Sequence, residues 1–189
     1  LVQISLPVGV GLSSSVTVGS NFSLRDQLIS ATLPRVDDAQ LNDIIDNGID
    51  QYVSTVTNES QVTVRTITLN LGSGQINPSA QPIVITGATG TGESDPAHPL
   101  RQEALVIDAR NLPPGTVLDL SQVEFAIVIG PATVIGGIGR NYVIGDGSNQ
   151  TIVLGPDDDI LRGGAGDDTV GSKGGNDHLF GDAGNDHLV

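Results

Sequence analysis

The chain has 189 residues, a formal net charge of −14 and no cysteine. So strong a negative charge argues against nucleic-acid backbones and anionic membranes as partners, because both are negative themselves. The lack of cysteine excludes disulfides and thiolate metal sites. No apolar run approaches the length of about eighteen residues that a membrane-spanning helix needs, so we expect no membrane insertion.

The N-terminal part of the chain predicts two short strands followed by one helix. Residues 1–20 have the pattern of two strands around a Gly/Ser turn, whereas residues 21–36 leave strand and helix both open. Within residues 37–56, apolar side chains recur at helical spacing, which predicts one helix near residues 38–56. The apolar stripe of this helix consists of Leu41, Ile44, Ile45, Ile49, Tyr52 and Val53.

The following stretch predicts strands separated by loops. Residues 61–71 alternate in two phases that switch at Arg65 and Thr66, which indicates a β-bulge there. Further strands are expected at residues 82–86, 103–109 and 117–120. Residues 1–126 are therefore expected to form a β-rich domain with one α-helix, for which a small sandwich is one arrangement left open.

Residues 127–189 divide into seven consecutive lines of nine residues. The eighth residue of every line is aliphatic, and the three residues around it suffice for a short strand whose central side chain faces a shared core. A fixed period of this kind is typical of a solenoid. The residues at position eight are Val134, Val143, Ile152, Leu161, Val170, Leu179 and Leu188. The residues at position six are Ala132, Asn141, Gln150, Asp159, Asp168, Asp177 and Asp186.

The last four position-six residues are aspartates placed beside glycine-rich turns. Calcium is a hard cation that takes six to eight oxygen ligands from carboxylates and main-chain carbonyls, and glycine turns expose such carbonyls. Two lines are expected to form one coil, so residues eighteen positions apart are stacked. We therefore expect Asp159 to lie against Asp177, and Asp168 against Asp186, in two rows of calcium-binding turns.

The lines follow the pattern G-G-x-G-x-D-x-U-x, where U is aliphatic. Residues 163–171 match it at every fixed position, residues 172–180 lack the first two glycines, and residues 181–189 lack the second. This stretch resembles the RTX calcium-binding repeats of secreted bacterial proteins. The resemblance implies a parallel β-roll solenoid with Ca²⁺ in its turns. The implied metal-binding residues are Asp159, Asp168, Asp177, Asp186, Gly163, Ala165, Gly181 and Ala183.

The first three lines depart from this pattern at position six. Ala132 has no side-chain oxygen, and Asn141 and Gln150 carry neutral ones. We expect these lines to form a metal-poor cap that is docked on the rest of the chain, since solenoid ends need atypical repeats.

The outer face of the predicted roll is apolar in its first coils. Ile135, Ile144 and Val153 are expected to point outward there, and packing against residues 1–126 is the favoured explanation of this patch. The ladder of threonines beside them leaves open a flat surface that binds a polysaccharide or another ordered surface.

No motif typical of catalysis is found in the sequence. It has neither an H-E-x-x-H zinc motif nor a G-x-S-x-G nucleophile turn. His98, beside Ser94 and Asp95, gives the one triad-like composition, and three such residues in one polar loop arise easily by chance. We therefore expect no enzyme activity from this chain.

Taken together, these patterns predict a mainly β protein: a β-rich domain at residues 1–126, then an RTX β-roll at residues 127–189. Through the resemblance we expect a secreted, extracellular or cell-surface module of the adhesin type, exported by type I secretion from a Gram-negative bacterium and folded by Ca²⁺. Two alternatives stay open, an accessory part of a secreted hydrolase or protease and a carbohydrate- or surface-binding module. The chain is expected to be a fragment of a longer one.

Overall fold

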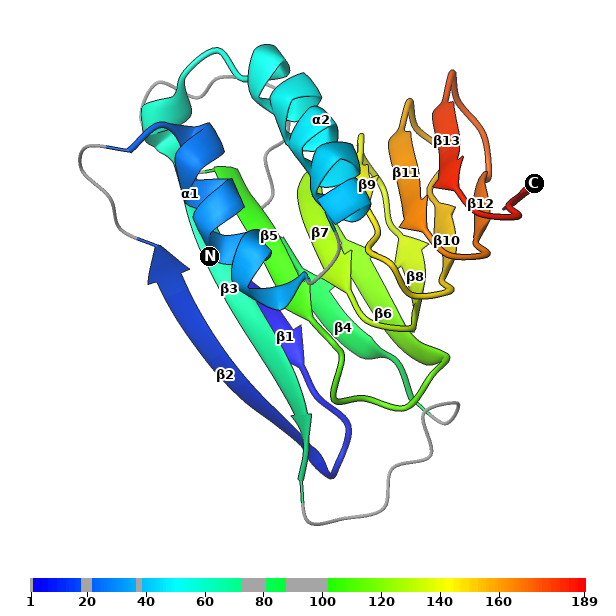
Figure 1. Ribbon diagram of the computed structural model, residues 1–189. Coiled ribbons are helices and arrows are strands. Elements are labelled where there is room, and N and C mark those ends of the chain that lie inside the picture. The colour runs from blue at the N-terminus through cyan, green and yellow to red at the C-terminus, as the bar shows by residue number, and fades with distance from the viewer. Residues whose placement is uncertain (1, 18–21, 37–38, 73–80, 88–101) are drawn as a thin grey trace.

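The computed structural model describes residues 2–17, 22–36, 39–72, 81–87 and 102–189, and it shows two facing β-sheets with helices on one of them (Figure 1). Within these residues each sheet has seven strands. Sheet A has the order β1 (Gln3–Ser5), β4 (Ile83–Thr86), β6 (Thr116–Ser121), β8 (Ala132–Gly136), β10 (Thr151–Leu154), β12 (Thr169–Ser172) and β14 (His187–Leu188). Sheet B has the order β13 (His178–Ala183), β11 (Ile160–Ala165), β9 (Tyr142–Ile144), β7 (Phe125–Ile129), β5 (Gln102–Asp108), β3 (Val62–Leu71) and β2 (Val10–Thr17).

From β3 onward, successive strands alternate between the two sheets, and neighbours within a sheet run parallel. The result is a β-solenoid of about five turns across residues 104–188. At the N-terminal edge the pairs β1–β4 and β2–β3 are antiparallel. A mainly β fold that ends in a parallel β-roll is therefore confirmed. Both sheets continue across residue 126, because β7 pairs with β5 on one side and β9 on the other. The division into two domains at that point stays a prediction.

The coil of eighteen residues is confirmed by the strand register. Thr133 pairs with Thr151, which pairs with Thr169, and Ile160 pairs with His178 on the other sheet. Earlier coils are less regular: the pairing of Val117 with Thr133 spans 133 − 117 = 16 residues. The spacing of eighteen residues between paired strands therefore begins within the stretch of nine-residue lines.

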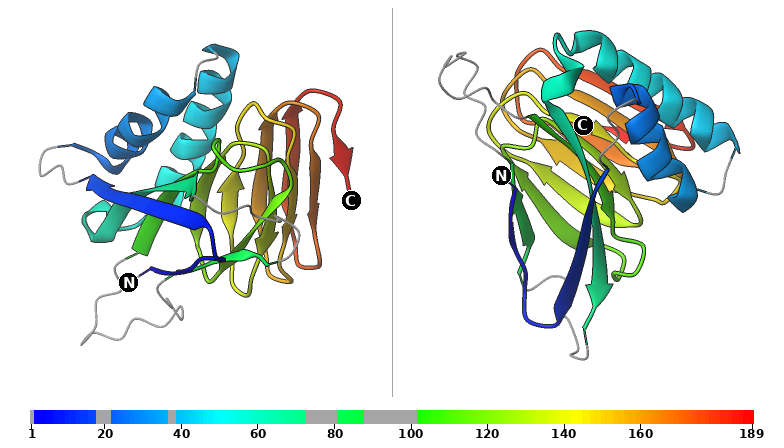
Figure 2. Two further views of the ribbon diagram at one scale, coloured as in Figure 1. Left: turned by 90° about the horizontal axis from the view of Figure 1, so that it is seen from below. Right: turned by 90° about the vertical axis from the view of Figure 1, so that its left-hand side faces the viewer.

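Two helices cover the outer face of sheet B, whereas the sequence predicted one. Helix α2 (Ala39–Thr55) is the predicted helix, and α1 (Leu24–Thr32) lies in the stretch that the sequence left open; short 3-10 turns follow at Leu33–Arg35 and Glu59–Gln61. The side chain of Ser23 caps α1 by accepting a hydrogen bond from the main-chain nitrogen of Asp26 at 3.1 Å. Figure 2 shows both helices on one side of the paired sheets. Neither helix is long and apolar enough to cross a membrane.

The two faces of sheet B are buried by different layers. Ile67 and Leu69 of β3 pack between the sheets, whereas Val62 and Val64 of the same strand pack beneath the helices. Successive side chains of a strand point to opposite faces, so the two phases seen in the sequence reflect two covering layers. The predicted bulge is wrong, because the pairing of β3 with β2 and β5 is continuous through Thr66.

Helix α2 contacts the roll closely at Gly48. A Cβ atom at this position would lie 2.7 Å from Cδ1 of Ile144 and 3.2 Å from Cδ of Arg162. The hydroxyl of Tyr142 donates a hydrogen bond to the main-chain oxygen of Gly48 at 3.0 Å, and the ring of Tyr52 stacks on Phe125 at 4.0 Å between centroids. The helix is therefore docked on the strands that begin the roll.

The docking explains only part of the apolar patch that the sequence predicted. Ile144 is buried beneath α2, as expected. Ile135 and Val153 lie on the outer face of sheet A, where they are half-buried and belong to neither core cluster. Among the described residues the helices cover sheet B and not these two side chains, so the packing of Ile135 and Val153 against residues 1–126 stays a prediction.

Candidate metal sites in the turns of the roll

The turns of the roll form two rows, one before each sheet. The first row consists of residues 136–141, 154–159 and 172–177, which precede β9, β11 and β13. The second row consists of residues 145–150, 163–168 and 181–186, which precede β10, β12 and β14. Each turn ends at position six, so the position-six side chains of one row are stacked from coil to coil.

A hydrogen-bond ladder links the position-six residues. The main-chain nitrogen of Asp159 donates to Oδ1 of Asp177 at 2.9 Å, and that of Asp168 donates to Oδ1 of Asp186 at 3.0 Å. The structure thus brings together both aspartate pairs that the sequence predicted. The ladder uses Oδ1 of Asp177 and Oδ1 of Asp186, so Oδ2 of each of these carboxylates is left for another partner.

The second oxygen of Asp168 is buried without a hydrogen-bond partner. Asp168 is 2% exposed, and its Oδ2 has no donor within the described part of the chain. A Cβ atom on Gly163 would lie 2.7 Å from this oxygen and 2.8 Å from the carbonyl oxygen of Gly181. Only glycine leaves these carboxylate and carbonyl oxygens room to face one turn, and oxygens of both kinds are what calcium prefers. The residues present therefore fit Ca²⁺.

The electrostatics of the turns also favour a bound cation. Burial, together with Asp186, Asp146 and Asp167, raises the pKa of Asp168 to about 7. Burial and the neighbouring Asp177 likewise raise the pKa of Asp159 above its ordinary value. A bound cation would supply the positive charge that these ionised carboxylates lack.

The main-chain residues named from the resemblance lie in the same turns. Ala165 pairs with Ala183 between β11 and β13, and the carbonyl oxygen of Ala183 accepts a hydrogen bond from Gly166 at 2.9 Å. Gly163 and Gly181 stand one coil apart beside Asp168 and Asp186, as described above. The role of all eight residues as calcium ligands stays a prediction.

A second ladder of side chains, which was not predicted from the sequence, runs along position five. The main-chain nitrogen of Asn176 donates to Oδ1 of Asp158 at 2.8 Å, and that of Asn185 donates to Oδ1 of Asp167 at 2.9 Å. The signal was present in the sequence, since position five is Asn or Asp in the last five lines. These residues are Asn149, Asp158, Asp167, Asn176 and Asn185.

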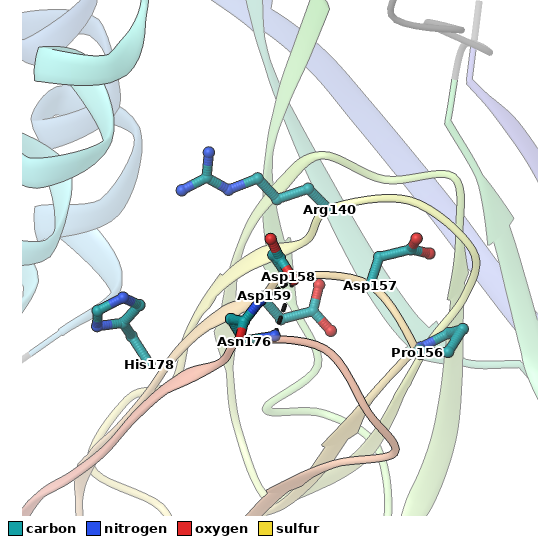
Figure 3. Close-up of a pocket in the computed structure, with 7 residues that line it drawn as sticks. All are labelled: Arg140, Pro156, Asp157, Asp158, Asp159, Asn176 and His178. Carbon is teal, nitrogen blue, oxygen red and sulfur yellow. Dashed lines mark hydrogen bonds between the residues drawn. The ribbon is translucent and has the colours of Figure 1, made fainter.

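A polar hollow of 580 Å³ lies outside the first row of turns (Figure 3). It is lined by Arg140, Pro156, Asp157, Asp158, Asp159, Asn176 and His178. Among the described residues, no group of three or more His, Cys, Asp or Glu side chains is placed to hold a metal ion. A cation in these turns would take main-chain oxygens among its ligands. His98, Ser94 and Asp95 lie outside the described residues.

Comparison with known families agrees with this geometry. The family model of the RTX calcium-binding nonapeptide repeat (4 copies) matches residues 135–170, 144–178 and 172–189. Residues 135–189 are RTX repeats. No curated protein and no solved structure matches the chain. RTX nonapeptide repeats bind Ca²⁺, so Ca²⁺ is the cofactor of this roll, and repeats of this kind generally occur in secreted proteins.

Proposed function

We propose that the chain is an extracellular structural module whose RTX roll folds when Ca²⁺ binds its turns. The observation that carries the proposal is the buried carboxylate of Asp168, which has a raised pKa and one oxygen that no described residue contacts by a hydrogen bond. Calcium supplies positive charge and accepts oxygen ligands in such a turn. Residues 145–189 hold nine aspartates against Arg162 and Lys173, so the chain repels itself there in the absence of a cation.

Folding and calcium binding are thereby one coupled event. The ligand oxygens come together only when neighbouring coils stack, so a preformed site does not exist in the unfolded chain. Where calcium is scarce, as inside a cell, the acidic repeats stay unfolded and suitable for export. Where calcium is plentiful, Asp159 and Asp177 close one row and Asp168 and Asp186 the other, and the roll becomes stiff.

The setting we propose is a larger adhesin-type or surface protein that a Gram-negative bacterium exports by type I secretion. The RTX repeats and the acidic, cysteine-free composition support this setting. No catalytic motif occurs in the sequence, which favours a structural role over that of an accessory part of an enzyme.

The test is a calcium titration of chelated protein followed by far-UV circular dichroism. We expect a gain of β signal with calcium, and a blunted gain when Asp168 and Asp186 are both changed to Ala. A variant with Asp43→Ala, which removes an exposed carboxylate from α2, should titrate like the parent chain. No bound calcium and no change in the spectrum would sink the proposal.

A second candidate function rests on the outer face of sheet A. Thr133, Thr151 and Thr169 stand in register across three neighbouring strands and are partly exposed. The helices cover sheet B and leave this face open in the described part of the chain (Figure 2). A flat face of this kind suits an extended polysaccharide. Retention on an insoluble polysaccharide that is lost in Thr151→Lys, and kept in Asn47→Lys on α2, would support it.

A further inference from the structure

The first turn of each row has a neutral amide at position six, and the oxygen of each amide is buried with no hydrogen-bond partner in the described part of the chain. Asn141 is 2% exposed and Gln150 is 3% exposed. Oδ1 of Asn141 and Oε1 of Gln150 receive no hydrogen bond from the described residues. An oxygen that is buried away from water and accepts no hydrogen bond raises the free energy of the folded state. Each of these two atoms is therefore expected to have a partner such as a cation.

The orientation of both amides is fixed by their NH₂ groups. Nδ2 of Asn141 donates to the carbonyl oxygen of Val123 at 2.8 Å. Nε2 of Gln150 donates to the carbonyl oxygens of Gly130 at 2.7 Å and Val128 at 3.2 Å, and it lies 3.1 Å from Oδ1 of Asp146. Each of these partners is an acceptor, so the nitrogen must face them. The oxygen on the other branch of the amide is therefore directed away from the preceding coil.

The amide oxygens lie in the same place within their turns as the carboxylate oxygens do in the consensus turns. A Cβ atom on Gly163 would meet Oδ2 of Asp168 and the carbonyl oxygen of Gly181. A Cβ atom on Gly145 would meet the equivalent pair, Oε1 of Gln150 and the carbonyl oxygen of Gly163. The first turn of this row thus presents a side-chain oxygen and a carbonyl oxygen to the next coil, as the second turn does.

The turn that ends at Asn141 shares the side-chain half of this construction, and Leu154 of the next coil takes the place of the glycine carbonyl beside Gly136. A Cβ atom on Gly136 would lie 2.7 Å from Oδ1 of Asn141. The position-six ladder also extends to both amides: the main-chain nitrogen of Asn141 donates to Oδ1 of Asp159 at 2.7 Å, and that of Gln150 donates to Oδ1 of Asp168 at 2.7 Å. The amide turns are therefore in register with the aspartate turns that follow them.

We infer that these two turns are the first calcium sites of the rows, one shared by Asn141 and Asp159 and the other by Gln150 and Asp168. The inference rests on the proposed function and extends it. The oxygen of each amide faces the first cation of its row. Its NH₂ group donates hydrogen bonds to carbonyl oxygens of the preceding coil, where a further cation would otherwise bind. The first lines are then the ends of the ion rows and are not free of metal.

The preceding coil explains why each row stops at an amide. Ala132 stands eighteen residues before Gln150 and has no side-chain oxygen to offer. The carbonyl oxygens of Val128 and Gly130, which would face a further cation, already accept hydrogen bonds from Gln150. A carboxylate at position 150 would place negative oxygens against the partly negative carbonyl oxygens. An amide instead donates hydrogen bonds to these carbonyls and presents its oxygen to the next coil.

The amide sites carry less negative charge than the sites between two aspartates. Calcium affinity depends strongly on the charge of the ligand set, so we expect the amide sites to bind on the order of tenfold more weakly. Calcium binding to the chain should then occur in two phases.

The deciding experiment locates calcium in crystals of the calcium-loaded chain by its anomalous scattering. We expect a peak between the turns of Asn141 and Asp159 and another between those of Gln150 and Asp168, besides the peaks at the two aspartate pairs. Peaks at the aspartate pairs alone overturn this inference and leave the proposed function intact. A chain that binds no calcium at any turn overturns the proposed function itself.

Variants give an independent measurement in solution, read as bound calcium per chain after equilibrium dialysis. Gln150→Met and Asn141→Leu keep the size of each side chain and remove its oxygen, so each should lose one calcium ion. Asn47→Leu, which replaces an exposed amide on α2, should lose none. Unchanged binding in both turn variants overturns the inference. If a turn variant fails to fold, the anomalous peaks of the parent chain decide.

Discussion

The first and last coils of the roll share one backbone design but differ in what covers them. Val134 and Ile152, at position eight of early lines, are fully buried. Leu179 is half-buried, and Leu188 at the same position of the last line is 51% exposed. The early coils are covered on both faces of sheet B, whereas the last coils have one apolar side chain for each nine residues and little to bury it. Hydrophobic burial therefore fades along the roll.

The position-six residues change in the opposite direction. Position six is Ala132, Asn141 or Gln150 in the first three lines and aspartate in the last four. Burial at position eight stays complete through Leu161 and Val170 and falls only in the last two lines. The same turn geometry and register are thus stabilised by two different forces in one solenoid. We expect apolar burial to be the main stabilising term in the early coils, and we expect cations to offset the repulsion between carboxylates in the last coils.

Helix α2 marks the transition between the two regimes. Its contacts through Gly48 reach Ile144 of β9 and Arg162 of β11, and Arg162 in turn pairs with Asp182 and lies over the ring of Phe180. This series of contacts joins the helical layer to the last coils. We expect it to give the last coils a preformed edge on which to stack when calcium binds.

Removal of calcium should give the largest difference between the two regions. With a chelator present, we expect amide hydrogen exchange to lose its protection across residues 154–189 and to keep it in β5 and β7, because those strands are buried between the helices and sheet A. Mass spectrometry of exchanged peptides measures this directly. Equal loss of protection in β5 and in the last coils would show that the early coils also depend on calcium.

A pair of core truncations should give an intermediate effect. With calcium present, Ile152→Ala should lower the free energy of unfolding by about 2–5 kcal/mol, since the side chain is fully buried between the sheets. Leu188→Ala, at the same position two coils later, should change it by less than about 0.5 kcal/mol because half of that side chain is in water. Chemical denaturation measures the free energy of unfolding of both variants. Equal decreases would contradict the difference in burial between the early and the last coils.

The pH dependence should give the smallest effect. The pKa of Asp168 is raised to about 7, so the folded metal-free chain binds more protons than the unfolded chain between about pH 4 and 7. Metal-free stability should therefore fall as the pH rises through this window. Calcium competes with the same proton, so the calcium concentration at half-saturation should rise up to about tenfold for each pH unit below 7.

Urea denaturation in the presence of a chelator measures the metal-free stability at each pH. Calcium titrations across the same pH range measure the calcium concentration at half-saturation. Asp168→Asn removes the titrating group and should flatten most of the metal-free dependence. A parent chain whose metal-free stability rises from pH 4 to 7 would contradict the sign.

The regular half of the molecule could be predicted from the sequence because its contacts repeat at a fixed spacing. A nine-residue period places Asp159 beside Asp177 and Thr151 beside Thr169 whatever the rest of the chain does. The α2 helix was also predictable, since its apolar stripe is long. The α1 helix has nine residues, and its few apolar positions fit a strand equally well.

Other features required contacts that no local pattern contains. The phase switch in β3 resembles a bulge until the helices are seen to cover one end of the strand. Ile135 and Ile144 have equivalent places in the repeat, yet the helices bury the second and not the first, which is half-buried on sheet A. The orientation of the Asn141 and Gln150 side chains depends on carbonyl groups in the preceding coil, which lie about twenty residues away in sequence.

The sequence by itself therefore determined the period, the pairing of the aspartates and the use of calcium, because these follow from the spacing of residues along the chain. Only the tertiary structure decided which face the helices cover and where each row of turns begins. Those outcomes depend on which layer happens to lie against a given strand, and a side chain's neighbours across layers leave no trace in its own local sequence.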